Sequence, residues 1–354
     1  MNRFRCYLLC ATALSILAGC AGGTNGATLS PSRALPQGIG RPEISQTFSR
    51  LYVADDGNST VTMYLHPARK LKQTVRQDIQ GPVSVAVDSS GTVYVANCGG
   101  ACSGNGSVAV IDKNGKKVRE ITDGISRPES VAVDPQGDLY VANVGFFFTS
   151  SYYYFPASVA MYAPGSSSPQ IAITGGVARP STVALDASEN VYVANDGFVT
   201  EYGPQLGSYI RSMTTRAPLS FAFDASGNLY VGNNSARDSS NVLVFAPGAT
   251  NPFETIKEGV NQPYAMTIDP AGNLYVANTF GNNITVYAIG STTPFATISQ
   301  GIDQPRGITL DGSGNVYVAN ASSNSVTEYA AGTYTLIKSI TQGVSFPQWL
   351  AFGP

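Results

Sequence analysis

Six aspartates recur at regular intervals along this chain, and regularly spaced carboxylates are a pattern that could bind calcium, a cation that prefers several oxygen ligands. They are Asp88, Asp134, Asp186, Asp224, Asp269 and Asp311. Each stands three residues before a turn position, which is glycine in five repeats and Glu189 in the other. Asp followed by Gly at the left-handed position is typical of a type I turn with a bulge, in which the carboxylate accepts hydrogen bonds from backbone N–H groups. We therefore interpret the aspartates as turn residues and expect local strain at Glu189.

The elements that carry these turns are indicated by a five-residue phrase of the form LYVAN. It occurs seven times, at residues 51–55, 93–97, 139–143, 191–195, 229–233, 274–278 and 316–320. Its central tyrosines are 38 to 52 residues apart, and the fullest copies contain four short β-rich runs separated by turn residues. A repeat of this length predicts an all-β fold, a β-propeller with one four-stranded blade per copy. We interpret the asparagines that end the phrase as turn residues too.

The number of blades follows from a second repeated element, a proline that opens the first strand. It occurs seven times, at Pro82, Pro128, Pro180, Pro218, Pro263, Pro305 and Pro347. The first LYVAN copy has no such strand before it, and the last proline, in residues 347–352, has no LYVAN copy after it. The C-terminal strand should therefore pair into the N-terminal blade and close a seven-bladed ring, which leaves no open sheet edge.

The residues after these prolines begin the innermost strands, so they should converge at one mouth of the central channel. Among them are Glu129, Tyr264, Arg306 and Gln348, and Trp349 stands next to the last. Charges of both signs and aromatic rings around one opening are how small-ligand sites are usually built. We predict a ligand mouth at these five residues; a solvent-filled mouth without a ligand is the alternative.

An aromatic insertion lengthens the third repeat at residues 145–155. Seven of its eleven residues are aromatic, namely Phe146, Phe147, Phe148, Tyr152, Tyr153, Tyr154 and Phe155. It lies between the second and third strands of its blade, so it should project from the same face as the post-proline residues. Exposed aromatic clusters are typical of contacts with a partner, a sugar ring or a membrane. The alternative is a loop that buries its own rings.

The N-terminus reads as a targeting segment. Arg3 and Arg5 precede an apolar stretch that is too short to span a bilayer, which favours a signal peptide. The residues Leu17-Ala-Gly-Cys20 resemble the bacterial lipobox, which implies a signal peptide at 1–19, lipidation of Cys20 and a tether over 20–47 before the propeller at 48–354. Acyl chains hold such a protein at the membrane. We expect a bacterial cell-envelope location outside the cytoplasm, at the outer membrane if the host is Gram-negative.

Two cysteines remain after removal of the signal and lipidation of Cys20. Cys98 and Cys102 are separated by three residues. An oxidising envelope compartment favours a local disulfide between them, and metal binding is the weaker alternative.

The repeat itself resembles a known family. The pattern G-x-x-x-P-x-x-V-A-V-D-x-x-G-N-L-Y-V-A-N, as at 259–278 and 301–320, resembles the NHL repeat and is similar to the YVTN repeat of seven-bladed surface propellers. The resemblance covers about residues 51–354 and implies a fold rather than an activity, since such propellers serve as binding proteins, scaffolds, lyases and lactonases.

Propeller enzymes of related types supply specific expectations. The gluconolactonase type resembles this chain at the start of its first strands, which implies a metal-binding Asn or Asp after the proline; here Glu129 is the one carboxylate at such a position. The amidating lyase and virginiamycin B lyase types depend on histidines, whereas this chain has only His66, which we interpret as a surface residue. No G-x-S-x-G elbow, P-loop or dinucleotide fingerprint is present.

Charge excludes one further class of function. Charged residues make up 12% of the chain and the net charge is −2, so there is no basic footprint for nucleic acid. The sequence therefore favours a lipid-anchored module that binds a protein, small molecule or glycan, without catalysis and without a required cofactor. The alternative is a metal-assisted hydrolase or lyase of the gluconolactonase-like type, with a calcium ion in the channel.

Overall fold

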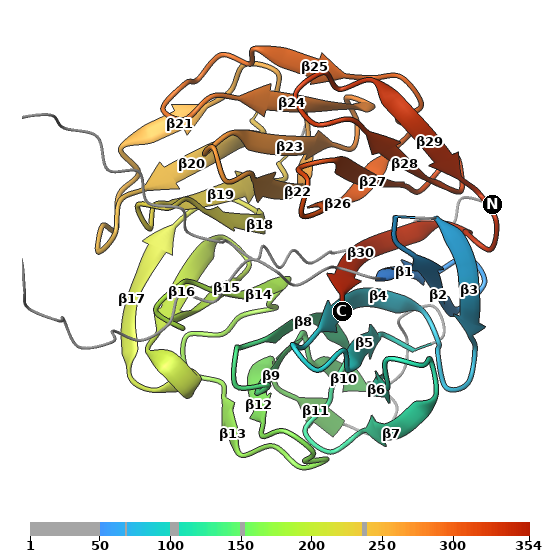
Figure 1. Ribbon diagram of the computed structural model, residues 1–354. Coiled ribbons are helices and arrows are strands. Elements are labelled where there is room, and N and C mark those ends of the chain that lie inside the picture. Colours follow the sequence, from blue (N-terminus) through green and yellow to red (C-terminus); the bar gives the residue numbers. More distant parts are fainter. Residues whose placement is uncertain (1–49, 68, 100–105, 149–152, 236–238) are drawn as a thin grey trace, which may run out of the picture.

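The computed structural model describes residues 50–67, 69–99, 106–148, 153–235 and 239–354. These residues form seven four-stranded antiparallel sheets, arranged as blades around a central channel (Figure 1). The predicted all-β, seven-bladed propeller is confirmed. Within the described residues, no helix is long and apolar enough to cross a membrane.

We name the blades A to G in ring order and give the strands of each from the channel outward. Blade A contains β30 (Pro347–Gly353), β1 (Arg50–Asp55), β2 (Thr60–Leu65) and β3 (Lys70–Val75). Blade B contains β4 (Pro82–Val87), β5 (Val93–Asn97), β6 (Ser107–Ile111) and β7 (Lys117–Ile121). Blade C contains β8 (Pro128–Val133), β9 (Leu139–Asn143), β12 (Ser158–Tyr162) and β13 (Ile171–Ile173). Blade D contains β14 (Thr182–Leu185), β15 (Val191–Ala194), β16 (Phe198–Tyr202) and β17 (Tyr209–Thr214), with the short 3-10 helix η2 (Pro204–Leu206) before its last strand.

The remaining blades follow the same plan. Blade E contains β18 (Pro218–Phe223), β19 (Leu229–Asn233), β20 (Asn241–Phe245) and β21 (Glu254–Ile256). Blade F contains β22 (Pro263–Ile268), β23 (Leu274–Asn278), β24 (Asn283–Tyr287) and β25 (Ala296–Ile298). Blade G contains β26 (Pro305–Leu310), β27 (Val316–Asn320), β28 (Ser325–Tyr329) and β29 (Leu336–Ile340). A separate two-stranded hairpin, β10 (Phe146–Phe148) and β11 (Tyr153–Phe155), interrupts blade C.

The LYVAN strands form the middle of each blade because both of their faces are apolar. All five residues of β9 are buried, for example. A sheet with two apolar faces must be covered on both sides. Neighbouring blades provide this cover: one core cluster joins Tyr140 of blade C to Val191 and Val193 of blade D. The hydrophobic core therefore lies between neighbouring blades, in separate clusters that follow the ring.

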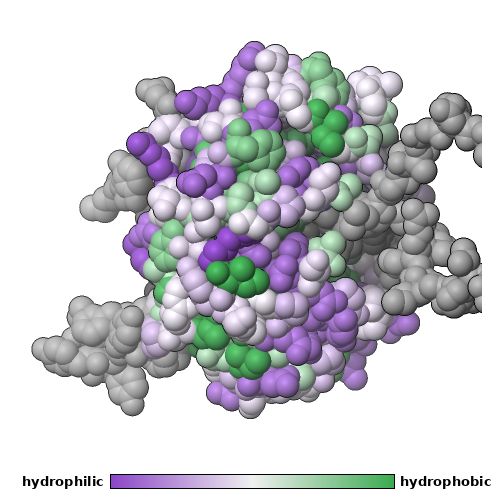
Figure 2. Space-filling model, turned by 90° about the vertical axis from the view of Figure 1, so that its left-hand side faces the viewer, coloured by the Kyte–Doolittle hydropathy of each residue, from purple (hydrophilic) through white to green (hydrophobic). Residues whose placement is uncertain are grey.

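The outermost strands face solvent on the rim. Val118 in β7 is 59% exposed and Ile337 in β29 is 46% exposed. On the part of the rim that Figure 2 shows, hydrophobic side chains are scattered among hydrophilic ones rather than gathered into one large patch. Isolated apolar residues of this kind are normal on protein surfaces and indicate no docking site.

The C-terminal strand closes the ring as predicted. β30 pairs antiparallel with β1, with Leu51 opposite Phe352 and Val53 opposite Leu350. Blade A is therefore built from both ends of the described chain (Figure 1).

The recurring aspartates cap their own turns, which confirms their structural interpretation. In blade C, Asp134 Oδ1 accepts hydrogen bonds from the backbone N–H groups of Gln136 (3.0 Å) and Asp138 (2.8 Å), and Oδ2 accepts one from the Tyr140 hydroxyl at 3.1 Å. The LYVAN asparagines are also structural: Asn143 Oδ1 accepts from the Ser126 N–H at 3.0 Å and ties its strand to the loop that enters the blade.

Glu189 adopts the left-handed conformation that glycine adopts in the other turns, with φ +63°. Because this region costs a residue with a side chain about 1–2 kcal/mol, we expect Glu189→Gly to raise the free energy of unfolding by about 0.5–1 kcal/mol, despite the larger entropy of glycine in the unfolded chain. Urea unfolding measures the change. Ser188→Gly in the same turn is the control and should give no gain; a loss of stability in Glu189→Gly would contradict the strain.

Candidate functional site

The two ends of the central channel differ in what surrounds them. We call the end where the first strands begin the proline end, and the end where they stop at the aspartate turns the turn end. At the proline end, the residue after the proline is skipped in the strand pairing, as between Pro305 and Gly307 in β26. Such a bulge re-aims the side chain of the extra residue. The same register shift occurs in β4, β8, β18, β22 and β30.

Three of the five predicted ligand-mouth residues meet at the proline end. Arg306 Nη1 donates a hydrogen bond to the Tyr264 hydroxyl at 3.1 Å and another to Gln348 Oε1 at 2.9 Å. The guanidinium carbon lies 5.0 Å from the centre of the Tyr264 ring and 4.9 Å from that of Phe346, within cation–π range. Arg306 is 8% exposed and Gln348 is fully buried. The three side chains therefore form a packed polar plug across blades F, G and A.

The other two predicted residues do not join this plug. Trp349 is 3% exposed and belongs to the hydrophobic core that also contains Ala54, its partner on β1. Glu129 begins β8 in blade C, which is separated from blade G by blades A and B in the ring. The described contacts thus place Glu129 apart from Arg306.

Glu129 is nonetheless a strongly perturbed acid of the proline end. It is 2% exposed, and among the described residues its carboxyl group lies within ion-pair distance of Arg127, whose Nε is 3.6 Å away. Burial raises the pKa of Glu129 to about 8, and the Arg127 guanidinium opposes this shift only in part. Burial therefore favours the protonated form of this carboxyl group.

The described residues around Glu129 do not supply the ligands that a divalent cation needs. A hard cation needs several oxygen ligands. The ring neighbours of Glu129 are Val83 and Ser181, and the Ser181 hydroxyl already donates to the Pro218 carbonyl at 3.0 Å. Throughout the part of the chain that the structure describes, no three His, Cys, Asp or Glu side chains are grouped so as to hold a metal ion.

The aromatic insertion forms a hairpin at the proline end. Its strands pair Phe146 with Phe155 and Phe148 with Tyr153. The hairpin is attached beside the Glu129 strand, since the Gly145 N–H donates to the Ser126 carbonyl at 3.1 Å. The structure describes its backbone only, and Tyr152 lies outside the described residues, so the interaction role of residues 145–155 stays a prediction.

The turn end holds a cavity that we did not predict from the sequence. Its volume is about 390 Å³. Its mouth is formed by the last apolar residues of first strands, namely Val87, Val133, Leu185, Ile268, Leu310 and Phe352. All six are partly exposed. The sequence does contain a signal for this cavity: the residue before each recurring aspartate is apolar, and such residues lie at the ends of the innermost strands, where they face the channel.

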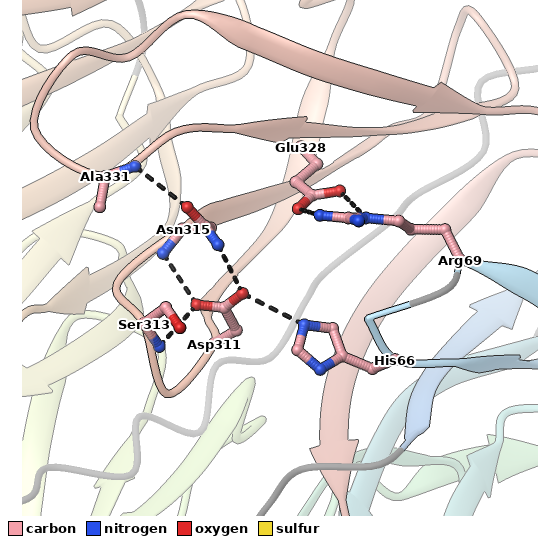
Figure 3. Close-up of polar contacts among 7 residues, drawn as sticks. All are labelled: His66, Arg69, Asp311, Ser313, Asn315, Glu328 and Ala331. Carbon is pink, nitrogen blue, oxygen red and sulfur yellow. Dashed lines mark hydrogen bonds and ion pairs between the residues drawn. The ribbon is translucent and has the colours of Figure 1, made fainter.

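His66 stands behind the rim of this cavity and is not the surface residue that we expected. Its Nε2 lies 3.1 Å from Asp311 Oδ2 (Figure 3). Its ring packs edge-on against Tyr317 and Phe352. Its side chain is only 14% exposed. The reason is ring closure: the turn between β2 and β3 reaches from blade A to blade G, where Arg69 also pairs with the buried Glu328 carboxylate. In each of the other five turns, a tyrosine hydroxyl donates a hydrogen bond to Oδ2 of the aspartate. At Asp311 the contact with His66 takes the place of that bond.

The predicted cysteine sites are described only in part. Cys98 is 1% exposed and is disulfide-bonded. Its predicted partner Cys102 lies outside the described residues, as does Cys20.

Part of the chain matches a known protein family. Residues 220–354, which include blades F and G, most of blade E and the closing strand, match the family model described as the SMP-30/Gluconolactonase/LRE-like region. No curated protein matches the chain. Together with the seven-bladed ring, this match supports a propeller of the NHL and gluconolactonase-like type.

Proposed function

We propose that this protein is a lipid-anchored, extracytoplasmic binding module of the bacterial cell envelope, and that it holds a small apolar ligand in the turn-end cavity. The observation that carries the proposal is the aliphatic wall of that cavity, whose volume of about 390 Å³ is in the range of small-molecule sites. Anchoring through Cys20 is the part of the proposal that rests on the sequence.

The chemistry of the cavity favours binding over catalysis. Asp311 is the one ionisable side chain among the described residues that line it. Both of its oxygens are occupied: Oδ1 accepts from the backbone N–H groups of Ser313 and Asn315, and Oδ2 contacts the Asn315 amide and His66. A carboxylate held in this way stabilises its turn and is poorly placed to move a proton.

Binding of an uncharged apolar dye such as Nile red to the Cys20→Ser full chain tests the proposal. We expect saturable binding of about one dye per chain, and about tenfold weaker binding for Leu310→Trp, because the larger ring fills the mouth. Leu336→Trp is the matched control: it changes a partly buried leucine on the outer strand of the same blade and should leave binding unchanged. Equal binding by wild type and Leu310→Trp would overturn the proposal.

The enzymatic alternative is favoured by the family match at residues 220–354. It would require Glu129 to hold a cation with oxygens that the described residues around it do not supply. Metal analysis of the purified full chain separates the two functions, since stoichiometric calcium or zinc would favour the enzyme.

A further inference from the structure

We infer that the ligand of the turn-end cavity is an uncharged amphipathic lipid, whose apolar chain enters the cavity from the membrane that anchors the protein. This inference rests on the proposed binding function and names the class of ligand. Three features of the cavity carry it: its wall, its polar rim and its position relative to the start of the propeller.

The wall suits an aliphatic chain. The described lining comes from the first strands of six blades, and behind the mouth it continues inward through Val85, Met266, Ile308 and Leu350. These are aliphatic or thioether side chains, and each is almost fully buried. Burial of an apolar chain against them is favourable in proportion to the apolar area removed from water. The polar plug of Arg306, Gln348 and Tyr264 begins two residues before Ile308, Leu350 and Met266 along the same strands.

The rim offers hydrogen bonds on one side only. Thr267 of blade F, and Thr309 and Ser313 of blade G, line the cavity next to one another. Thr267 and Thr309 are partly exposed and Ser313 is exposed. Their hydroxyl groups can donate and accept, as a hydroxyl, ester or amide head group requires.

The charge at the rim selects against ionised head groups. The Asp311 carboxylate is 2% exposed and would repel an anionic head group at this side of the mouth. A cationic head group would find both carboxylate oxygens already occupied by the turn, by Asn315 and by His66 (Figure 3). A cation would therefore lose its hydration at the apolar mouth without gaining a direct hydrogen bond to Asp311, and an uncharged head group avoids both this cost and the repulsion.

The position of the mouth points to the membrane as the source. The described chain begins at Arg50, which is paired with Gly353 and whose Nη1 donates to the Pro354 carbonyl. Gly353 and Pro354 directly follow Phe352, which lies at the mouth of the cavity. In the sequence, residues 21–49 alone stand between this point and Cys20. Lipidation at Cys20 therefore keeps the mouth near the bilayer, whereas the aromatic hairpin lies at the opposite, proline end.

Competition with bound Nile red tests the head-group preference. The Cys20→Ser full chain is titrated with a monoacylglycerol, a fatty acid and an alkyltrimethylammonium ion of one chain length, all below their micelle concentrations. We expect the monoacylglycerol to displace the dye at about tenfold lower concentration than either ion. Equal displacement by all three, or better displacement by an ion, overturns the inference. Absence of any dye binding would instead refute the proposed function.

Variants and vesicles complete the test. The double variant Thr267→Val, Thr309→Val should reduce the preference for the uncharged lipid to less than about threefold. The control variant Thr297→Val, on the exposed face of β25, should keep the full preference.

The lipidated protein should take up fluorescent diacylglycerol from its own phosphatidylethanolamine–phosphatidylglycerol vesicles about tenfold faster than the Cys20→Ser protein takes it up from free vesicles. Equal uptake rates would overturn the membrane as the source.

Discussion

Glu129→Gln should raise the free energy of unfolding of this propeller, by an amount that grows as the pH rises from about 4.5 to about 8. The folded pKa of Glu129, about 8, lies above its ordinary value of 4.5 because the carboxyl group is buried. The stabilisation of the protonated form is therefore complete below pH 4.5 and is lost as the pH rises towards 8. Between these two pKa values, the unfolding free energy of the wild type falls by at most about 1.4 kcal/mol per pH unit, the limit for one proton. At pH 9 the variant should therefore be more stable than the wild type by a few kcal/mol.

Urea unfolding of both proteins at pH 5, 7 and 9 measures this effect. The two free energies should be similar at pH 5 and diverge at higher pH. Glu258→Gln, at an exposed position before blade F, is the control and should change stability by less than about 0.5 kcal/mol at every pH. A difference for Glu129→Gln that does not vary with pH would mean that Glu129 is ionised in the native protein. A bound cation would then become the better account of the proline end, and the enzymatic alternative would gain support.

Trp349→Ala should lower the free energy of unfolding by about 3–5 kcal/mol, the usual cost of deleting a large buried aromatic side chain. Trp349 lies on the strand that closes the ring, and it packs in a core cluster to which blades A, B, E, F and G contribute. Loss of its ring opens a cavity where the two ends of the chain meet, so we also expect the unfolding rate to rise.

Circular dichroism during urea unfolding measures this change, because the variant lacks the single tryptophan and cannot be followed by its fluorescence. Phe253→Ala is the matched control, since Phe253 is 61% exposed and its truncation should cost less than about 0.5 kcal/mol. If the two variants lost similar stability, packing of Trp349 on the closing strand would not contribute to the stability of the propeller as the structure indicates.

The architecture was predictable because its rules are local and repeated. Alternation of apolar residues made the LYVAN phrase a strand buried on both faces, and the offset between seven phrases and seven prolines required β30 to pair with β1. Turn chemistry also acts over a few residues, which is why the role of Asp134 and the left-handed conformation of Glu189 could be predicted.

The candidate sites depended on the arrangement of whole blades. The sequence placed Gln348 and Trp349 at one mouth, but neighbouring residues of a strand point to opposite faces, so Gln348 joins Arg306 while Trp349 enters the core. Similarly, nothing local shows that the turn holding His66 reaches across the ring to Asp311.

The sequence by itself determined the seven blades, the closure of the ring and the residues that cap its turns, because each of these follows from patterns within one or two repeats. Only the tertiary structure decided which side chains meet at each end of the channel. At the proline end, long polar side chains from three neighbouring blades bond to one another. At the turn end, apolar side chains from the first strands of six blades surround a cavity.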